Sequence, residues 1–294
     1  MAFHDVLSGL KALFLEKPAS RDGWRAVLAA RAPGLSPAER DALLAIPEDR
    51  LDVYVGMLRD NQATMLKFVA PMTIEALARF SGAPEAEVAR RTLLEAPRKT
   101  SRLRELAARL VEHLRGPGRP WVDRCPAVLD LARLEQAQTE AFYALDDADA
   151  LSPPAFAARV AAATVEEVLA LPWKPSAALR ILAIDFDVLG WRGKRYETEQ
   201  WPDPPPRLSR PIEVACARDP GTLQGEWHRI EPRLLELLRP EGHAGWAPLE
   251  GLALAWVEAT DMDPEDPAAP GHFIEQVAAW VRAGIVAVGA GHLP

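Results

Sequence analysis

The sequence predicts an α+β protein in which a mainly helical N-terminal domain is followed by a small winged-helix-like α+β module. Through the first half of the chain, apolar residues recur at steps of three and four between helix start and stop signals. Toward the C-terminus, apolar and polar residues instead alternate, which is typical of strands. A length of 294 residues is sufficient for about two domains with cores of their own.

Capping and breaking residues predict the helices of residues 1–118. A capping box at residues 36–39, with proline at the first helical position, begins a helix that runs to about residue 45. Thr73 can cap a short helix, and two more are expected over about 85–95 and 101–114. The sequence Gly-Pro-Gly at 116–118 ends the last of them. We therefore assign residues 1–118 to a helical domain.

A longer helix is expected from residue 50 to about 69, because apolar residues recur there on one face. They are Leu51, Val55, Leu58, Met65 and Val69. Asn61 and Gln62 interrupt this face. A buried amide without hydrogen-bond partners costs roughly 1–3 kcal/mol. The sequence thus predicts a satisfied polar pair inside a helical bundle.

Residues 119–200 form a predicted connecting region of helices and one strand. A helix is expected from Pro126 to about residue 145, and a second capping box, Thr164 to Glu167, begins a short helix that ends before Pro172. From residue 179 to 188 the apolar residues alternate with others, which predicts a strand.

Residues 201–294 form the predicted C-terminal module, which begins with a proline-rich linker at 201–206. Alternating residues on both sides of a turn at 219–221 predict a hairpin. Helices are expected over about 232–238, 247–258 and 273–283. Residues 285–288 are predicted to form a final strand. A hairpin, three helices and a final strand have winged-helix character.

The distribution of charge weighs against nucleic acid as a partner. The formal net charge is −8, and residues 210–294 carry 6 arginines, no lysine and 13 acids. Duplex binding depends on cationic side chains that displace counterions from phosphates. A basic cluster between residues 90 and 115 contains Arg98 and Arg102, and is either a solvated helical surface or a docking surface for an acidic partner.

The sequence contains no familiar catalytic or metal-binding motif. Cys125 and Cys216 are far apart, and the 6 histidines are scattered, so we expect no disulfide, no metal site and no cofactor. Asp185 and Asp187 share a strand face, which is more typical of a solvated surface than of an acid–base pair. With no secretion signal and no membrane span, a cytoplasmic location is expected.

Three stretches, in order, resemble one known family. The first includes Arg50-Leu51, Val53-Tyr54, Met57-Leu58-Arg59-Asp60-Asn61, Pro71 and Thr73; the second includes 130–135 and 140–142; the third includes Lys174-Pro175-Ser176 and 179–182. They are similar to the HvfC/BufC-type partner proteins, whose helical domain was formerly labelled DNA-binding. The chain departs from the family pattern at Val55-Gly56, Ala70 and Gln136.

The resemblance implies an accessory role. Members of this family are partners of multinuclear non-heme iron-dependent oxidative enzymes, which modify ribosomally made peptides. The partner is thought to recruit the precursor peptide and to support the enzyme. The resemblance therefore implies a non-catalytic subunit, with no catalytic residues of its own, that binds both the oxidase and the precursor peptide. A winged-helix DNA-binding transcriptional regulator is the alternative.

Strand edges and exposed anchors are the candidate binding residues. An extended peptide can join an open sheet edge through main-chain hydrogen bonds. The predicted peptide-binding residues are Ile212, Val214, Cys216, Ile285, Val286 and Val288. The candidate partner contacts are Arg98, Arg102, Trp201 and Trp227, although burial of the two tryptophans as core residues at the domain junction is the simpler explanation.

Overall fold

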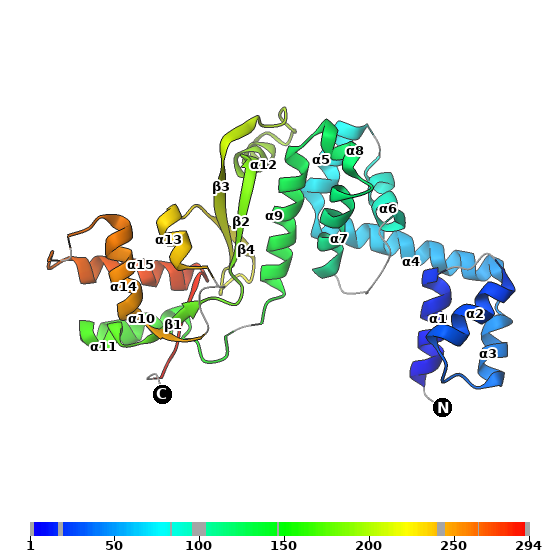
Figure 1. The fold of residues 1–294 in the computed structure, drawn as a ribbon, viewed down its shortest axis with the longest axis horizontal. Coiled ribbons are helices and arrows are strands. Elements are labelled where there is room, and N and C mark those ends of the chain that lie inside the picture. The colour runs from blue at the N-terminus through cyan, green and yellow to red at the C-terminus, as the bar shows by residue number, and fades with distance from the viewer. Residues whose placement is uncertain are drawn as a thin grey trace.

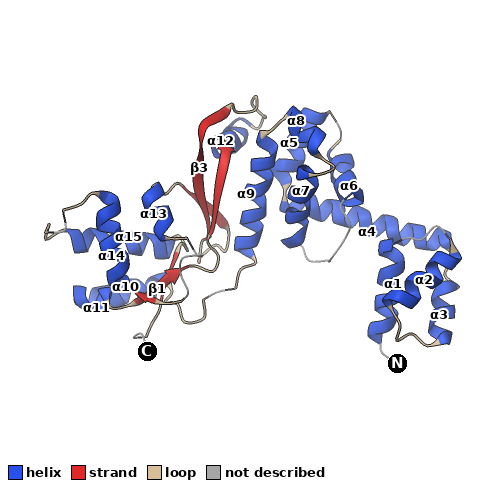
Figure 2. Ribbon diagram, in the orientation of Figure 1, coloured by secondary structure: helices blue, strands red, loops and turns tan. Residues whose placement is uncertain are grey.

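The computed structural model describes residues 3–16, 20–82, 84–95, 104–145, 147–239, 245–263 and 265–291. The molecule is elongated, with an N-terminal lobe, a central lobe and a C-terminal lobe (Figure 1). The elements described before residue 150 are all helices, and later residues form two antiparallel sheets of three strands each (Figure 2). The predicted α+β class is confirmed.

The N-terminal lobe consists of three short helices, α1 (Phe3–Glu16), α2 (Arg21–Arg31) and α3 (Pro37–Leu44). Their buried apolar side chains form a small separate core, which contains Leu13, Trp24, Leu28, Ala32, Leu35 and Leu43. The capping box predicted at the start of α3 is present, because the Glu39 carboxylate accepts from the Ser36 N–H at 2.9 Å and Ser36 Oγ accepts from the Glu39 N–H at 3.3 Å.

One long helix, α4 (Glu48–Val69), leads from this lobe to the central lobe (Figure 1). The amide pair predicted inside a bundle is wrong for Asn61, whose side chain is exposed. The side chain of Gln62 lies outside the described residues. Val53, Met57 and Phe68 are 61%, 63% and 76% exposed, and their spacing places them on one side of the helix. We call these three exposed apolar side chains the α4 stripe; the exposed polar residues Asn61 and Thr64 lie on the same side of the helix between Met57 and Phe68.

The central lobe is built around α9. Its helices are α5 (Pro71–Ser81), α6 (Glu85–Glu95), α7 (Arg104–Arg115), α8 (Arg119–Arg124) and α9 (Ala127–Phe142). One side of α9 packs on α5, α7 and α8, and another packs on a sheet, so that a single core joins helices and strands (Figure 1). The spacing of buried residues along α9 explains this position, because apolar side chains occur around most of the helix.

The sheet on α9 has the strand order β2-β3-β4. Its strands are β2 (Arg180–Phe186), β3 (Arg207–Arg218) and β4 (Gly225–His228), and α12 (Val188–Thr198) follows β2. The strand predicted at 179–188 and the hairpin predicted around 219–221 are confirmed. At the hairpin turn the Asp219 carboxylate accepts from the N–H groups of Gly221 and Thr222, a common device for fixing a turn.

The boundary predicted after residue 200 falls inside this sheet. β2 precedes the boundary and β3 follows it, yet the two strands pair from Arg180 with Cys216 to Phe186 with Arg207. The proline-rich linker at 201–206 therefore connects two neighbouring strands. Trp201 in this linker packs on Trp191 of α12, with ring centroids 4.5 Å apart.

The C-terminal lobe combines five helices with a second sheet of order β5-β1-β6. The helices are α10 (Pro153–Ala162), α11 (Val165–Leu169), α13 (Pro232–Leu237), α14 (Leu249–Thr260) and α15 (Ala269–Arg282). The strands are β1 (Pro172–Pro175), β5 (Ala247–Pro248) and β6 (Val286–Val288). Phe156, Trp173, Leu235 and Phe273 are among the buried residues of its core.

The predicted winged-helix-like module is divided between these two lobes. The hairpin, the three helices and the final strand occur in the predicted order, but β3 and β4 lie in one sheet and β6 lies in the other. The reason is that β6 pairs with β1, which comes from the predicted connecting region. No helix among the described residues has both the length and the apolar character needed to cross a membrane.

Candidate functional site

Two carboxylates on α9, Glu135 and Glu140, join stretches of sequence that carry the family resemblance, and a third, Asp130, holds the end of β2. Glu135 accepts from the N–H groups of Met72 and Thr73, at 2.8 and 2.9 Å. These groups begin α5, whose N-terminal N–H groups have no partner within the helix. Glu135 is only 4% exposed, and burial raises its pKa, while the N–H donors act in the opposite direction. Glu135 thus caps a helix from 62 residues away in the sequence.

Asp130 also accepts from two backbone N–H groups, which in this case lie at the end of strand β2. One of its oxygens accepts from the N–H groups of Asp185 and Phe186, at 2.6 and 3.1 Å, and the other accepts from Arg133 at 3.0 Å. Burial raises the pKa of Asp130, and these donors oppose that rise. Asp130 therefore fixes the end of β2 to α9.

Glu140 makes the third contact, at the C-terminal end of α9. Its carboxylate accepts from Arg180 Nε at 3.2 Å and from Gln136 Nε2 at 2.8 Å. The side chains of Glu140 and Arg180 are 36% and 33% exposed, so this ion pair lies at the surface. Together the three carboxylates connect α5, α9 and β2, and the residues of the resemblance serve to assemble the central lobe.

The first predicted peptide-binding edge, at Ile212, Val214 and Cys216, is not open. These residues lie in β3, the middle strand, opposite Ile184, Leu182 and Arg180 of β2. Backbone groups of successive residues point to opposite edges of a strand. Because the Asp219 N–H bonds to the Gln224 carbonyl, the odd-numbered residues of β3 face β4 and these three face β2. Their backbone groups are therefore not available to a peptide.

The second predicted edge, at Ile285, Val286 and Val288, is only partly paired, although all three residues are buried, with Val286 3% exposed. β6 is an edge strand, and bonds from Ser176 N–H to the Ile285 carbonyl and from Gly289 N–H to the Pro172 carbonyl place Ile285 and Gly289 toward β1. Val286 and Val288 consequently face outward. The Val288 carbonyl already accepts from Leu151 N–H at 2.7 Å. Within the described chain, no backbone group bonds to the outward side of Val286.

Prolines explain why Val286 is left open. The segment that pairs with Val288 continues into Pro153 and Pro154, and Ser152 caps helix α10 at that point. Proline has no N–H to donate to a strand, and its fixed φ suits the first turn of a helix. The backbone pairing between the segment at Leu151 and strand β6 therefore ends before it reaches Val286.

A pocket of about 600 Å³ lies against this open position. Its lining residues come from five places: β6, the end of α15, the β3–β4 turn, the β1–β2 turn, and the segment that leads into α10. They include Leu151, Pro153, Leu223, Val281 and Val286. We call it the edge pocket. It is mainly apolar, and Leu223 at its rim is 48% exposed.

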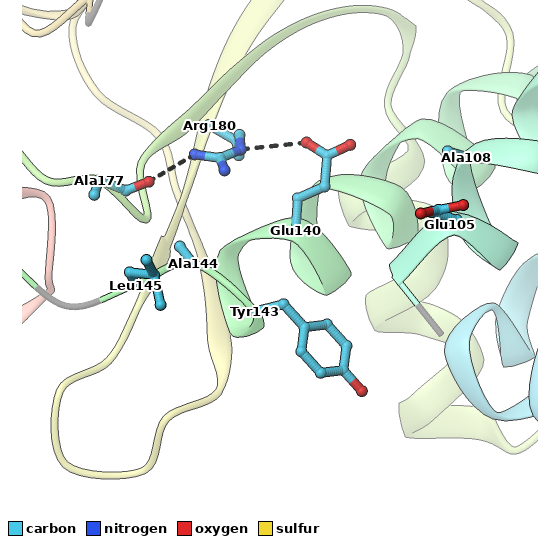
Figure 3. Close-up of a pocket in the computed structure, with 8 residues that line it drawn as sticks. All are labelled: Glu105, Ala108, Glu140, Tyr143, Ala144, Leu145, Ala177 and Arg180. Atoms are coloured by element: carbon cyan, nitrogen blue, oxygen red, sulfur yellow. Dashed lines mark hydrogen bonds and ion pairs between the residues drawn. The ribbon is translucent and has the colours of Figure 1, made fainter. Parts of the chain in front are cut away.

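A second pocket, of about 460 Å³, lies beside the C-terminal end of α9 (Figure 3). It is lined by Glu105, Glu140, Tyr143, Leu145, Arg180 and three alanines. We call it the glutamate pocket. Leu145 lines both pockets, which are therefore neighbours on the surface.

The predicted partner contacts are not exposed anchors where the structure describes them. Trp201 and Trp227 are partly buried and pack against the core around α9. Their indole nitrogens are inaccessible to solvent. Of the two explanations given by the sequence, packing in the core is the one that fits. Arg98 and Arg102 lie outside the described residues.

The aspartates Asp185 and Asp187 are separated by their ion pairs. Asp185 pairs with Arg207 at 3.3 Å, while Asp187 pairs with Arg229 at 2.9 Å and caps α12 by accepting from Gly190 N–H. Among the described residues, no group of three or more His, Cys, Asp or Glu side chains could hold a metal ion.

Both cysteines are buried free thiols, and we predict that they resist alkylation in the folded protein. Cys125 and Cys216 are 1% and 0% exposed, and burial raises their pKa values to about 11 and about 12. The reactive species is the thiolate, which is scarce at such pKa values. Mass spectrometry after iodoacetamide treatment should find two modifications in denaturant and none in the native protein. Rapid labelling of either native cysteine would show that the packing around it is wrong.

The chain matches no protein-family model and none of the curated proteins with which it was compared.

Proposed function

We propose that this protein is a non-catalytic partner subunit that recruits a ribosomally made precursor peptide to a multinuclear non-heme iron oxidase. The observation that carries the proposal is the mainly apolar edge pocket, which is lined by Val286, a buried edge-strand residue whose outward backbone groups have no described backbone partner. An extended peptide gains affinity from main-chain hydrogen bonds at such an edge and specificity from pockets for its side chains. The resemblance of residues 50–182 to HvfC/BufC-type proteins supplies the class of enzyme and of peptide.

The α4 stripe supports the other half of this proposal, the docking of the oxidase. Val53, Met57 and Phe68 form an exposed apolar surface on the long helix that joins two lobes. Exposed apolar side chains on one side of a helix can contribute to a protein–protein interface. The stripe and the edge pocket lie in different lobes, so one molecule can hold both partners in the cytoplasm, where the precursor is made.

Regulation of transcription, the alternative function, gains no support from the geometry. The predicted wing and the final strand belong to different sheets. The acidic charge of residues 210–294 also disfavours binding to phosphates.

Co-purification of three components tests the proposal. The tagged chain should be produced together with an oxidase and a precursor peptide encoded beside its gene, and we expect both to be retained. Replacing Met57 with glutamate should release the oxidase and keep the peptide, because a charge in the α4 stripe must be desolvated on docking. Leu254→Glu is the matched control, since Leu254 is 65% exposed on α14, compared with 63% for Met57. Retention of neither component by the unmodified chain would refute the proposed function.

A further inference from the structure

Among the described residues, the glutamate pocket is lined by two carboxylates and one cation. The cation is Arg180, and its hydrogen bonds already hold it against the pocket wall. Its Nε donates to Glu140 at 3.2 Å and its Nη1 donates to the Ala177 carbonyl at 2.9 Å (Figure 3). Nη1 also donates to the Leu179 carbonyl at 2.8 Å. The described lining residues therefore carry one more negative than positive charge, and Arg180 forms part of the pocket wall.

Glu105 is the carboxylate that is available to a ligand. It lies in the first turn of α7 and lines the pocket, facing α9 across the space between them (Figure 3). Within the described residues it makes no hydrogen bond and no ion pair. Its charge acts on Arg109, one turn farther along α7, but that guanidinium is buried. Glu105 thus presents a negative charge to the pocket.

The remaining walls suit the aliphatic part of a long cationic side chain. Tyr143 and Leu145 are 39% and 85% exposed, and Tyr143 is held edge-on against Phe142 with the ring centroids 5.0 Å apart. Lysine and arginine bury their methylene groups on apolar surface while the charged end reaches polar groups. An aromatic face also attracts a cation directly.

We infer that the glutamate pocket binds a lysine or arginine side chain of the peptide held at the edge pocket. This inference rests on the proposed function. Leu145 lines both pockets, and successive residues of one turn alternate between them: Ser176 and Ala178 line the edge pocket, and Ala177 lines the glutamate pocket. A peptide bonded to Val286 can therefore extend past Leu145 and place a cationic side chain between Glu105 and Tyr143.

A positional-scanning library of short synthetic peptides tests this selectivity without knowledge of the natural sequence. The unmodified protein is expected to enrich lysine and arginine at one position of the bound peptides. Glu105→Gln should lose this enrichment and weaken binding of the selected peptide about fivefold, the effect of a partly exposed ion pair of about 1 kcal/mol. The loss should diminish as salt concentration rises.

Glu112→Gln is the matched control, because Glu112 lies on the same helix, also acts on Arg109, and does not line the pocket. It should bind peptides as the unmodified protein does. Peptides selected without a preference for lysine or arginine, or equal losses in the two variants, would overturn this inference and leave the proposed function intact. Selection of no peptide at all by the unmodified protein would overturn both.

Discussion

Replacing Glu135 with alanine should lower the free energy of unfolding by about 3 kcal/mol. The change leaves the N–H groups of Met72 and Thr73 buried at the start of α5 without an acceptor. Each such loss costs roughly 1–3 kcal/mol, and part is offset because the desolvated carboxylate, whose pKa burial raises, is also removed. Denaturation in urea, followed by circular dichroism, measures the difference.

Glu112→Ala is the control for this experiment, because Glu112 is exposed on α7 and its carboxylate, unlike that of Glu135, does not accept from the N–H groups of α5. Its effect should stay within about 0.5 kcal/mol, as is usual for surface substitutions. Equal stability of the two variants would show that Glu135 does not hold α5 on α9, and the explanation of the resemblance as a set of assembly contacts would fail.

Placing an arginine at Leu223 should abolish most peptide binding, with an affinity loss of at least about tenfold. Leu223 lines the edge pocket and is 48% exposed, so a longer charged side chain can be accommodated by the fold while it obstructs the mainly apolar pocket. Burying that charge beneath a peptide without a partner costs more than the roughly 1.4 kcal/mol that corresponds to tenfold. Fluorescence anisotropy with the peptide selected from the library measures the loss.

Leu254→Arg makes the same chemical change on α14, outside the edge pocket, and should leave the affinity unchanged. Unfolding curves of both variants establish that each is folded. If Leu223→Arg binds the peptide as tightly as Leu254→Arg, then the peptide does not occupy the edge pocket.

The features predicted correctly from sequence are those set by neighbouring residues. Both capping boxes and the hairpin turn at Asp219 involve donors and acceptors two or three residues apart. The class of the fold followed from these local signals together with apolar periodicity.

The features missed depend on pairing between distant residues. β1 contains Pro172 and Pro175, which argue against a strand, yet it is the middle strand of the C-terminal sheet. That pairing takes β6 away from the predicted C-terminal module. Ile212, Val214 and Cys216 have the alternation of a strand, but alternation does not tell an edge strand from a central one.

Only part of the candidate site could be predicted from the sequence. Val286 was among the predicted peptide-binding residues, and Pro153-Pro154 is a visible stop signal, but their proximity comes from the fold. Glu105 and Glu140 carry no local signal, since glutamates on helices are usually solvated. Their role in one pocket follows only from the packing of α7 beside α9.

Hydrogen exchange at the backbone amide of Val286, followed by NMR with and without the selected peptide, tests the central claim most directly. Because this amide faces outward from β6 and has no described backbone partner, it should exchange markedly more slowly once the peptide is bound. The amides of Val214 and Cys216, already paired with β2, should change little. A peptide that binds at full occupancy while exchange at Val286 stays the same would contradict capture at this strand edge.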